Sequence, residues 1–161
     1  MEKIKCQWLV CSNYNVLFTL VLALLSFSAK ADWPQQVKQV EGEKRVLVVI
    51  TPYATHPLYS RQMKDIYQNA SGISERDLTV WQVIGKDQVL NEGEAVQSEN
   101  NPEQLVEQFR KSFNVKGSAY TVVLIGKDGT EKLRQRYPLS TQKLFEKIDA
   151  MPMRQAEMAQ D

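Results

Sequence analysis

The chain has 161 residues, a formal net charge of +1 and nearly equal numbers of acidic and basic side chains. A protein that binds nucleic acid needs a clustered basic surface for its phosphate contacts, and this composition gives no sign of one. Both cysteines, Cys6 and Cys11, precede a short apolar run near the N-terminus. A chain that loses this segment retains no thiol, which argues against cysteine chemistry in the processed protein.

Residues 1–31 have the pattern of an export signal. A positively charged start is followed by an unbroken apolar run over residues 16–25, and Ala29-Lys30-Ala31 has small residues at the two positions that a signal peptidase reads. We expect cleavage between Ala31 and Asp32, so that the protein is exported to the periplasm or the extracellular space and meets the membrane only transiently. An uncleaved anchor is the alternative, but a spanning helix needs about 20 mainly apolar residues, and polar residues flank this shorter run.

The remaining residues, 32–161, have the length of one ordinary domain. We divide them into a lead-in segment, 32–44, and a folded domain, 45–161. With no disulfide available, the domain depends on apolar packing for its stability. Trp33 is expected to pack down and tether the lead-in segment, and Trp81 is expected to lie in the core.

Strand and helix patterns alternate along the folded domain. Four segments have the apolar or alternating pattern of strands: residues 45–51, 77–85, 119–127 and 131–137. Three segments have helical spacing of apolar residues: residues 58–70, 102–113 and 140–151. Ser71-Gly72 is expected to stop the first helix, Asn101 to cap the second, and Asp128-Gly129 to form a two-residue hairpin turn. The polar segment 86–101 is predicted to be a loop.

The order of these elements is β-α-β-α-β-β-α. Strands joined by helical crossovers are expected to be parallel, and the pair joined by the hairpin must be antiparallel. The order predicts an α/β protein of thioredoxin-like architecture, with a four-stranded mixed sheet and helices on both of its faces.

Several stretches also resemble domain-of-unknown-function family 4174, known as the P-DUDES domain. They are residues 45–52 (RVLVVITP), 57–62 (PLYSRQ), 123–129 (VLIGKDG) with Lys132-Leu133-Arg134, and 148–154 (IDAMPMR) with Glu157-Met158. The resemblance covers essentially all of the chain after the export signal and implies a thioredoxin-like fold distantly similar to peroxiredoxins. It implies small exported proteins in bacteria and modules of extracellular sushi-repeat proteins in vertebrates, without an established activity.

The loop after the first strand, residues 51–57, is where thioredoxin-like redox proteins hold their reactive cysteine, because a helix N-terminus stabilises a thiolate. This loop has no cysteine. Peroxiredoxins also need a threonine and an arginine nearby; Thr51, Thr55 and Arg61 fit that description, but the sulfur is missing. Before the third strand, residues 116–119 stand where redox-active relatives place a cis-proline. Both departures predict a protein that is not a thiol oxidoreductase or peroxidase.

His56, the single histidine of the chain, permits two interpretations. In the first, a cysteine-independent enzyme uses Thr55, His56 and Arg61, with the imidazole as a neutral base at a helix N-terminus. In the second, which we favour, His56-Pro57 simply begins a helix, because a base also needs an orienting partner and a substrate site. One histidine without cysteine cannot fill the usual zinc ligand set, so we predict no metal or other cofactor.

Four residues are candidates for ligand binding: Thr51, Tyr53, Tyr120 and Arg134. Arg134 alternates with Lys132 and Arg136 along the last predicted strand, so the three cations share one face. That face suits an acidic partner, although charges also protect sheet edges from unwanted pairing.

The C-terminal stretch 151–154 (MPMR) is expected to turn the chain sharply after the last helix. Met153 and Met158 would then pack back on the sheet, with Arg154 near Glu157 one helical turn on. Taken together, the sequence predicts an exported binding module without thiol redox chemistry, whose partner is a protein or another ligand of the cell envelope or extracellular space. The cysteine-independent enzyme is the alternative.

Overall fold

The computed structural model describes residues 32–97 and 101–160, so the predicted signal segment and Ala31 lie outside the described residues. The strands are β1 (Arg45–Thr51), β2 (Leu78–Ile84), β3 (Gln88–Asn91), β4 (Glu94–Ala95), β5 (Thr121–Ile125) and β6 (Glu131–Gln135). The helices are α2 (Gln35–Lys38), α3 (Pro57–Gln68), α4 (Ala70–Glu75), α5 (Pro102–Ser112), α6 (Thr141–Asp149) and α7 (Pro152–Met158).

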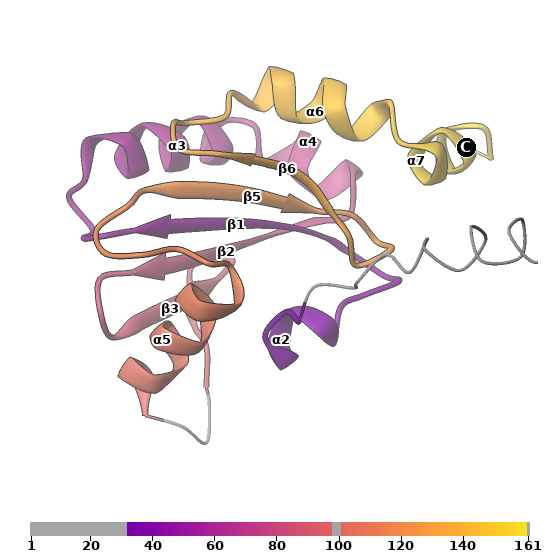
Figure 1. Cartoon of the computed structure of the whole chain (residues 1–161). Coiled ribbons are helices and arrows are strands. Elements are labelled where there is room, and N and C mark those ends of the chain that lie inside the picture. Colours follow the sequence, from indigo (N-terminus) through magenta and orange to yellow (C-terminus); the bar gives the residue numbers. More distant parts are fainter. Residues whose placement is uncertain (1–31, 98–100, 161) are drawn as a thin grey trace, which may run out of the picture. The chain divides into compact units, whose positions relative to one another are not determined.

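The strands of the described part of the chain form one mixed sheet in the order β4-β3-β2-β1-β5-β6 (Figure 1). The predicted α/β class, with helices on both faces, is confirmed, but the predicted number of four strands is wrong. β3 and β4 form inside segment 86–101, which we predicted to be a loop. Both residues of β4 are exposed, and β3 has one buried residue, Val89. This edge of the sheet therefore needs no continuous apolar run, and its strands leave little pattern in the sequence.

The strand directions agree with the prediction at two of three junctions. β1 and β2 are parallel in register from Arg45 opposite Leu78 to Thr51 opposite Ile84, and the hairpin pair β5 and β6 is antiparallel. β5 also runs antiparallel to β1, where we expected a parallel crossover. The connection from β2 to β5 contains the β3–β4 hairpin as well as α5, so it is not the simple strand–helix–strand unit to which the parallel rule applies.

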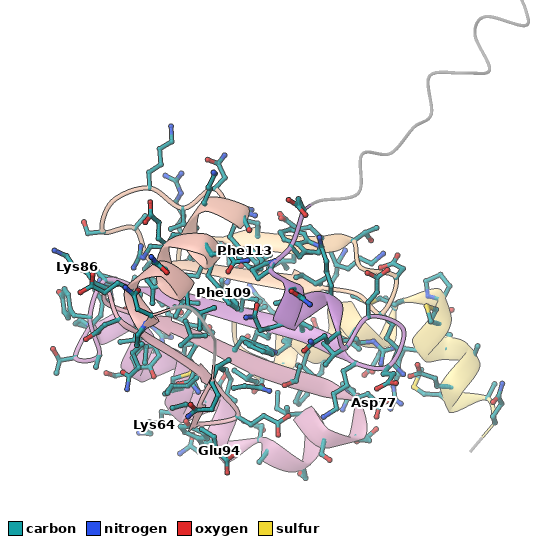
Figure 2. The ribbon with its side chains drawn as sticks, turned by 90° about the horizontal axis from the view of Figure 1, so that it is seen from below. Lys64, Asp77, Lys86, Glu94, Phe109 and Phe113 are labelled. Atoms are coloured by element: carbon teal, nitrogen blue, oxygen red, sulfur yellow. The ribbon has the colours of Figure 1, made fainter. Side chains whose placement is uncertain are left out.

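The two faces of the sheet are covered by different helices (Figure 1). On one face, Val46, Val48 and Ile50 of β1 pack with α2 and α5, and Figure 2, viewed from this side, labels Phe109 and Phe113 of that cluster. On the other face, Leu47 and Val49 pack with α3, α4 and α6. Every residue of β1 is buried, as the continuous apolar run predicts.

The helix boundaries show one confirmed cap and one error. The side chain of Asn101 accepts a hydrogen bond from the Gln104 amide at 2.8 Å, which confirms the predicted N-cap of α5. The predicted stop at Ser71-Gly72 is wrong, because α4 continues through it after a break at Asn69. A Cβ atom on Gly72 would lie 2.6 Å from the Phe145 ring, so glycine here permits the close approach of α4 to α6.

Both predictions for tryptophan are confirmed. Trp33 is 5% exposed, its indole N–H donates to the Gly129 carbonyl at 2.7 Å, and its ring stacks on Phe113 at 4.7 Å. Trp81 is buried against Phe109, with 5.8 Å between ring centroids. The lead-in segment is thus anchored in the apolar core by its tryptophan.

The C-terminal helix α7 is held by charges and not by methionines. Met153 and Met158 are exposed, so the expectation that they pack on the sheet is wrong. Arg154 takes the inward position instead, pairing with Glu75 at 2.8 Å and, as predicted, with Glu157 at 3.7 Å. The helix places the guanidinium against surrounding carboxylates, and this placement turns the methionine before it toward solvent.

Candidate functional site

The loop after β1 leads directly into α3, as predicted. Thr51 is the last residue of β1 and is fully buried, while Thr55 is exposed. Extended His56 occupies the N-cap position and Pro57 is the first helical residue. The His56 side chain makes no capping hydrogen bond, so only its backbone contributes to the start of the helix.

Side-chain hydrogen bonds to backbone carbonyls fix the beginning of this loop. The Thr51 hydroxyl donates to the Tyr53 carbonyl at 3.0 Å. Arg110 of α5 donates to the carbonyls of Thr51 at 2.9 Å, Gly85 at 3.3 Å and Gly117 at 3.0 Å. Partial burial lowers the pKa of the Arg110 guanidinium. One side chain thus joins the ends of β1 and β2 to the segment before β5, and sequence reasoning missed it because its partners lie far away in the chain.

Three aromatic side chains meet beside the N-terminus of α3. The His56 ring lies parallel to the Tyr120 ring, with 5.7 Å between centroids and 3° between planes, and the half-exposed Tyr53 ring lies 5.2 Å from His56. His56 Nδ1 and the Tyr120 hydroxyl are buried and have no hydrogen-bond partner among the described residues. Burial raises the pKa of the Tyr120 phenol, so it stays protonated. The structure therefore brings Tyr53, His56 and Tyr120 together.

The two arginine candidates lie elsewhere. Arg61 is exposed on α3 and lines a separate hollow with Asp65 and Leu139, and it forms no hydrogen bond or ion pair with Thr55 or His56. Arg134 lies on β6 and donates to Glu131 and to the Phe113 carbonyl. Neither arginine adds a cation to the aromatic group at the N-terminus of α3.

The His56 ring has no hydrogen bond to any described residue that would orient it as a base. A histidine base is normally oriented by a carboxylate or carbonyl on its second nitrogen, and no carboxylate of the described part of the chain bonds to His56.

No group of three or more His, Cys, Asp or Glu side chains within residues 32–97 and 101–160 is placed to hold a metal ion. Among these same residues, no helix is both long and apolar enough to cross a membrane.

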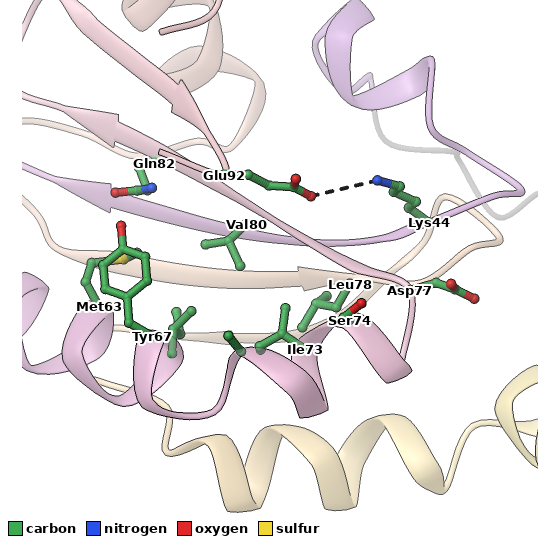
Figure 3. Close-up of a pocket in the computed structure, with 12 residues that line it drawn as sticks. Lys44, Met63, Tyr67, Ile73, Ser74, Asp77, Leu78, Val80, Gln82 and Glu92 are labelled. Carbon is green, nitrogen blue, oxygen red and sulfur yellow. Dashed lines mark ion pairs between the residues drawn. The ribbon is translucent and has the colours of Figure 1, made fainter. Parts of the chain in front are cut away.

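A groove lies beside α3 and α4. It encloses about 400 Å³, and Figure 3 shows it running between the two helices and β2. We call it the α3–α4 groove; its lining includes Met63, Tyr67, Ile73, Leu78, Val80 and Gln82. An ion pair between Lys44 and Glu92, 3.8 Å long, marks one end of it (Figure 3).

Gln82 lies at the other end of the α3–α4 groove (Figure 3). The side chain is 1% exposed, and its Oε1 accepts a hydrogen bond from the Tyr59 hydroxyl at 2.6 Å. Its Nε2 has no partner among the described residues. Partial burial raises the pKa of the Tyr59 phenol, and the neighbouring Tyr67 phenol adds to the rise. The groove therefore combines apolar side chains with charged residues toward one end and, at the other, a buried amide whose N–H groups are free to donate.

The sequence of this chain is similar to that of a known protein family. The profile of the family described as "Domain of unknown function (DUF4174)" matches residues 36–157. The chain belongs to the DUF4174 family. The "Sushi repeat-containing protein SRPX" of Rattus norvegicus is 29% identical over 120 residues, and SRPX2 of Xenopus laevis is 23% identical over 124 residues. These matches cover 74% and 77% of this chain, but 25% and 27% of the relatives, so this DUF4174 chain spans about a quarter of their length.

Peroxiredoxins are among the solved structures that superpose on this chain. The reduced 2-Cys peroxiredoxin of Plasmodium vivax superposes with a TM-score of 0.54 at 17% identity, covering 76% of this chain and 84% of that chain. Thioredoxin peroxidase I of Plasmodium yoelii gives 0.54 at 15% identity, covering 78% and 81%. The DUF4174 domain thus has a thioredoxin-like fold distantly similar to peroxiredoxins. At these identities the likeness concerns the fold alone.

Proposed function

We propose that this DUF4174 protein is an exported binding module without thiol redox chemistry, and that the α3–α4 groove receives its ligand. The ligand we infer is a small, mainly apolar molecule that carries one hydrogen-bond acceptor. The observation that carries the proposal is the groove itself: a volume of about 400 Å³ is within the range of small-molecule pockets, and Gln82 supplies a buried polar group among apolar residues.

Export is supported by the pattern of residues 1–31 and by the resemblance to extracellular modules. The absence of thiol chemistry is supported by the sequence after residue 31, which has no cysteine. A thiolate is the required nucleophile in disulfide exchange. We expect purified residues 32–161 neither to reduce insulin with a thiol donor nor to consume peroxide with one; sustained turnover in either assay would contradict this part of the proposal.

The cysteine-independent enzyme, with Thr55, His56 and Arg61, is less well supported. Arg61 faces a different hollow, and the imidazole stacks on the Tyr120 ring. A binding role for Thr51, Tyr53 and Tyr120 is a second, weaker proposal, because none of them lines the groove and the Thr51 hydroxyl is already used within the loop.

The groove is tested by filling it. Ala70 is exposed and lines the groove, so Ala70→Trp places an indole across it. Ala156 is exposed on α7, so Ala156→Trp is a matched control away from the groove. The probe is 1-anilinonaphthalene-8-sulfonate, measured by its own fluorescence. We expect saturable binding by the wild type and by Ala156→Trp, and at least tenfold weaker binding by Ala70→Trp. Equal binding by all three proteins would refute the groove as the ligand site.

A further inference from the structure

A second hollow, on the α5 side of the sheet, has a different chemistry. It encloses about 630 Å³ between the segment before β5 and strand β6. Its lining consists of Asn114, Val115, Lys116, Ala119, Thr121, Arg134 and Arg136. Three of these side chains are cationic and none is acidic. The whole chain is close to neutral, so this concentration of positive charge is local.

Hydrogen bonds fix the orientation of the Arg134 guanidinium in this hollow. Its Nε and Nη2 donate to the two carboxylate oxygens of Glu131 at 2.8 Å and 2.6 Å, and its Nη1 donates to the Phe113 carbonyl at 2.7 Å. A guanidinium has five N–H donors, and these bonds use three of them. Phe113 caps the C-terminus of α5, where a cation is favourable. Arg134 is therefore fixed in orientation and still has donors for a ligand.

Lys116 and Arg136 are exposed and form no ion pair with any other described residue. They approach the hollow from different elements, Lys116 from the segment before β5 and Arg136 from the end of β6. Thr121 lines the same hollow and is 3% exposed. The hollow thus gathers three cations and a hydroxyl, against one carboxylate, that of Glu131.

We propose that this hollow binds the phosphate monoester group of a ligand. A phosphate monoester carries nearly two negative charges at neutral pH and three strong acceptor oxygens, which matches donors arriving from several directions. A carboxylate carries one charge and two oxygens, and one guanidinium suffices for it. Two sources of this group fit an exported protein: a soluble sugar phosphate and a lipid whose headgroup is a phosphate monoester. The site is separate from the α3–α4 groove, so the two proposals stand or fall independently.

The experiment measures binding to residues 32–161 by calorimetry with inorganic phosphate, glucose 6-phosphate and acetate, and by sedimentation with phosphatidylcholine vesicles with and without phosphatidic acid. Lys116→Gln and Arg136→Gln remove cations without touching the bonds of Arg134. Lys143→Gln, an exposed lysine of α6, is the matched control.

We expect saturable binding of inorganic phosphate, at least tenfold weaker binding of acetate, and a loss of about tenfold in phosphate affinity for each hollow variant, since a hydrogen bond to a charged group contributes about 1.5 kcal/mol or more. Lys143→Gln should bind as the wild type does. Tighter binding of glucose 6-phosphate identifies the soluble source, and binding of only the vesicles with phosphatidic acid, lost in the hollow variants, identifies the lipid. No saturable binding of any phosphate probe, equal affinity for acetate, or equal losses in Lys143→Gln would overturn the proposal.

Discussion

Two groups of cationic side chains in this molecule differ in what surrounds them. The first, here called the α7 cluster, contains Arg45, Arg76, Lys127 and Arg154. Each of its cations is paired with at least one carboxylate: Arg45 with Glu157 at 3.0 Å, Arg76 with Asp149 at 2.7 Å, Lys127 with Asp77 at 2.8 Å and with Glu157 at 2.7 Å, and Arg154 with Glu75 at 2.8 Å. The second group lines the hollow proposed above to bind phosphate, here called the phosphate hollow, and consists of Lys116, Arg134 and Arg136. Of these three, only Arg134 has a carboxylate partner within the described residues.

Burial follows the same division. Arg45 and Arg154 are almost inaccessible, whereas Lys116 and Arg136 are exposed. A buried charge is tolerated when it is paired and hydrogen-bonded, and an unpaired cation stays where water or a ligand can reach it. The position of the carboxylates therefore decides the role of each cation: those with internal partners hold the C-terminal segment in place, and those without them stay available for binding.

The largest expected effect comes from removing the carboxylate that the α7 cluster shares. Glu157→Ala leaves Arg45 buried and without its carboxylate, and Lys127 loses one of its two partners. Breaking one side of a buried pair costs about 3 kcal/mol or more. We expect the free energy of unfolding in urea to fall by about that amount. Glu107→Ala, an exposed glutamate of α5, should change it by less than about 0.5 kcal/mol; a similar loss in both variants would remove the distinction between the two groups.

The next effect contrasts neighbouring residues of α7. Arg154→Ala removes the pairs with Glu75 and Glu157, so we expect a loss of about 1.5 kcal/mol in the free energy of unfolding. Met153→Ala should change it by less than about 0.5 kcal/mol, because the methionine is exposed. Thermal and urea unfolding of both variants measure this, and a larger loss for Met153→Ala would restore the methionine as the anchor.

A smaller loss of stability is expected when the pH is lowered. Partial burial raises the pKa of Glu157, but hydrogen bonds from Lys127 and Arg45 outweigh it, so this pKa lies below its ordinary value. A carboxyl with a lowered pKa contributes stability above its unfolded value of about 4.3, and this contribution is lost as the pH falls through the folded pKa.

We expect the acid-induced loss of stability to be reduced in Glu157→Gln and unchanged in Glu107→Gln. Some loss should persist, because the pKa of Asp128 is also lowered: partial burial raises it, but hydrogen bonds from Lys132 and Thr130 outweigh that burial. Urea unfolding between about pH 3 and 7 measures how the free energy of unfolding depends on pH. The same loss of stability in acid for the wild type and Glu157→Gln would contradict the role given to Glu157.

The smallest expected change in the free energy of unfolding comes from substitutions in the phosphate hollow. Replacing both Lys116 and Arg136 by glutamine should change the free energy of unfolding by less than about 0.5 kcal/mol, because neither cation has an internal partner among the described residues. The same urea titration measures it. A loss above about 1 kcal/mol would show that these cations stabilise the fold, and the contrast with the α7 cluster would disappear.

Local signals in the sequence were sufficient for the central part of the fold. The continuous apolar runs of β1 and β5 and the Asn101 cap each depend on neighbouring residues, and these predictions are confirmed. The hairpin between β5 and β6 also forms, but the predicted two-residue turn at Asp128-Gly129 is wrong, because the connection spans residues 126–130 and its turn hydrogen bond runs from the Gly129 amide to the Gly126 carbonyl. The pairing of Trp33 with Phe113 could be predicted only as burial, because the partner lies on a distant helix. β3 and β4 escaped prediction because most of their residues are not buried.

The candidate sites were less predictable, for a physical reason. The sequence indicates both Tyr120 and His56 as candidates, but their stacking depends on how β5 lies against the start of α3. Arg110, whose three carbonyl partners come from three separate segments, carries no local signal. Lys116 joins Arg134 and Arg136 through the fold, whereas Lys132, which alternates with them in sequence, pairs with Asp128 instead.

The stacking of Trp33 on Phe113 has an optical consequence for the phosphate hollow. The carbonyl of Phe113 accepts the hydrogen bond that fixes Arg134. A dianion bound at Arg134 therefore changes the electric field near Phe113, whose ring stacks on the Trp33 indole. Indole emission responds to such fields. Trp81, the other tryptophan among the described residues, lies in the same apolar cluster, and the α7 cluster contains none. The intrinsic fluorescence of residues 32–161 should therefore report a ligand entering the hollow.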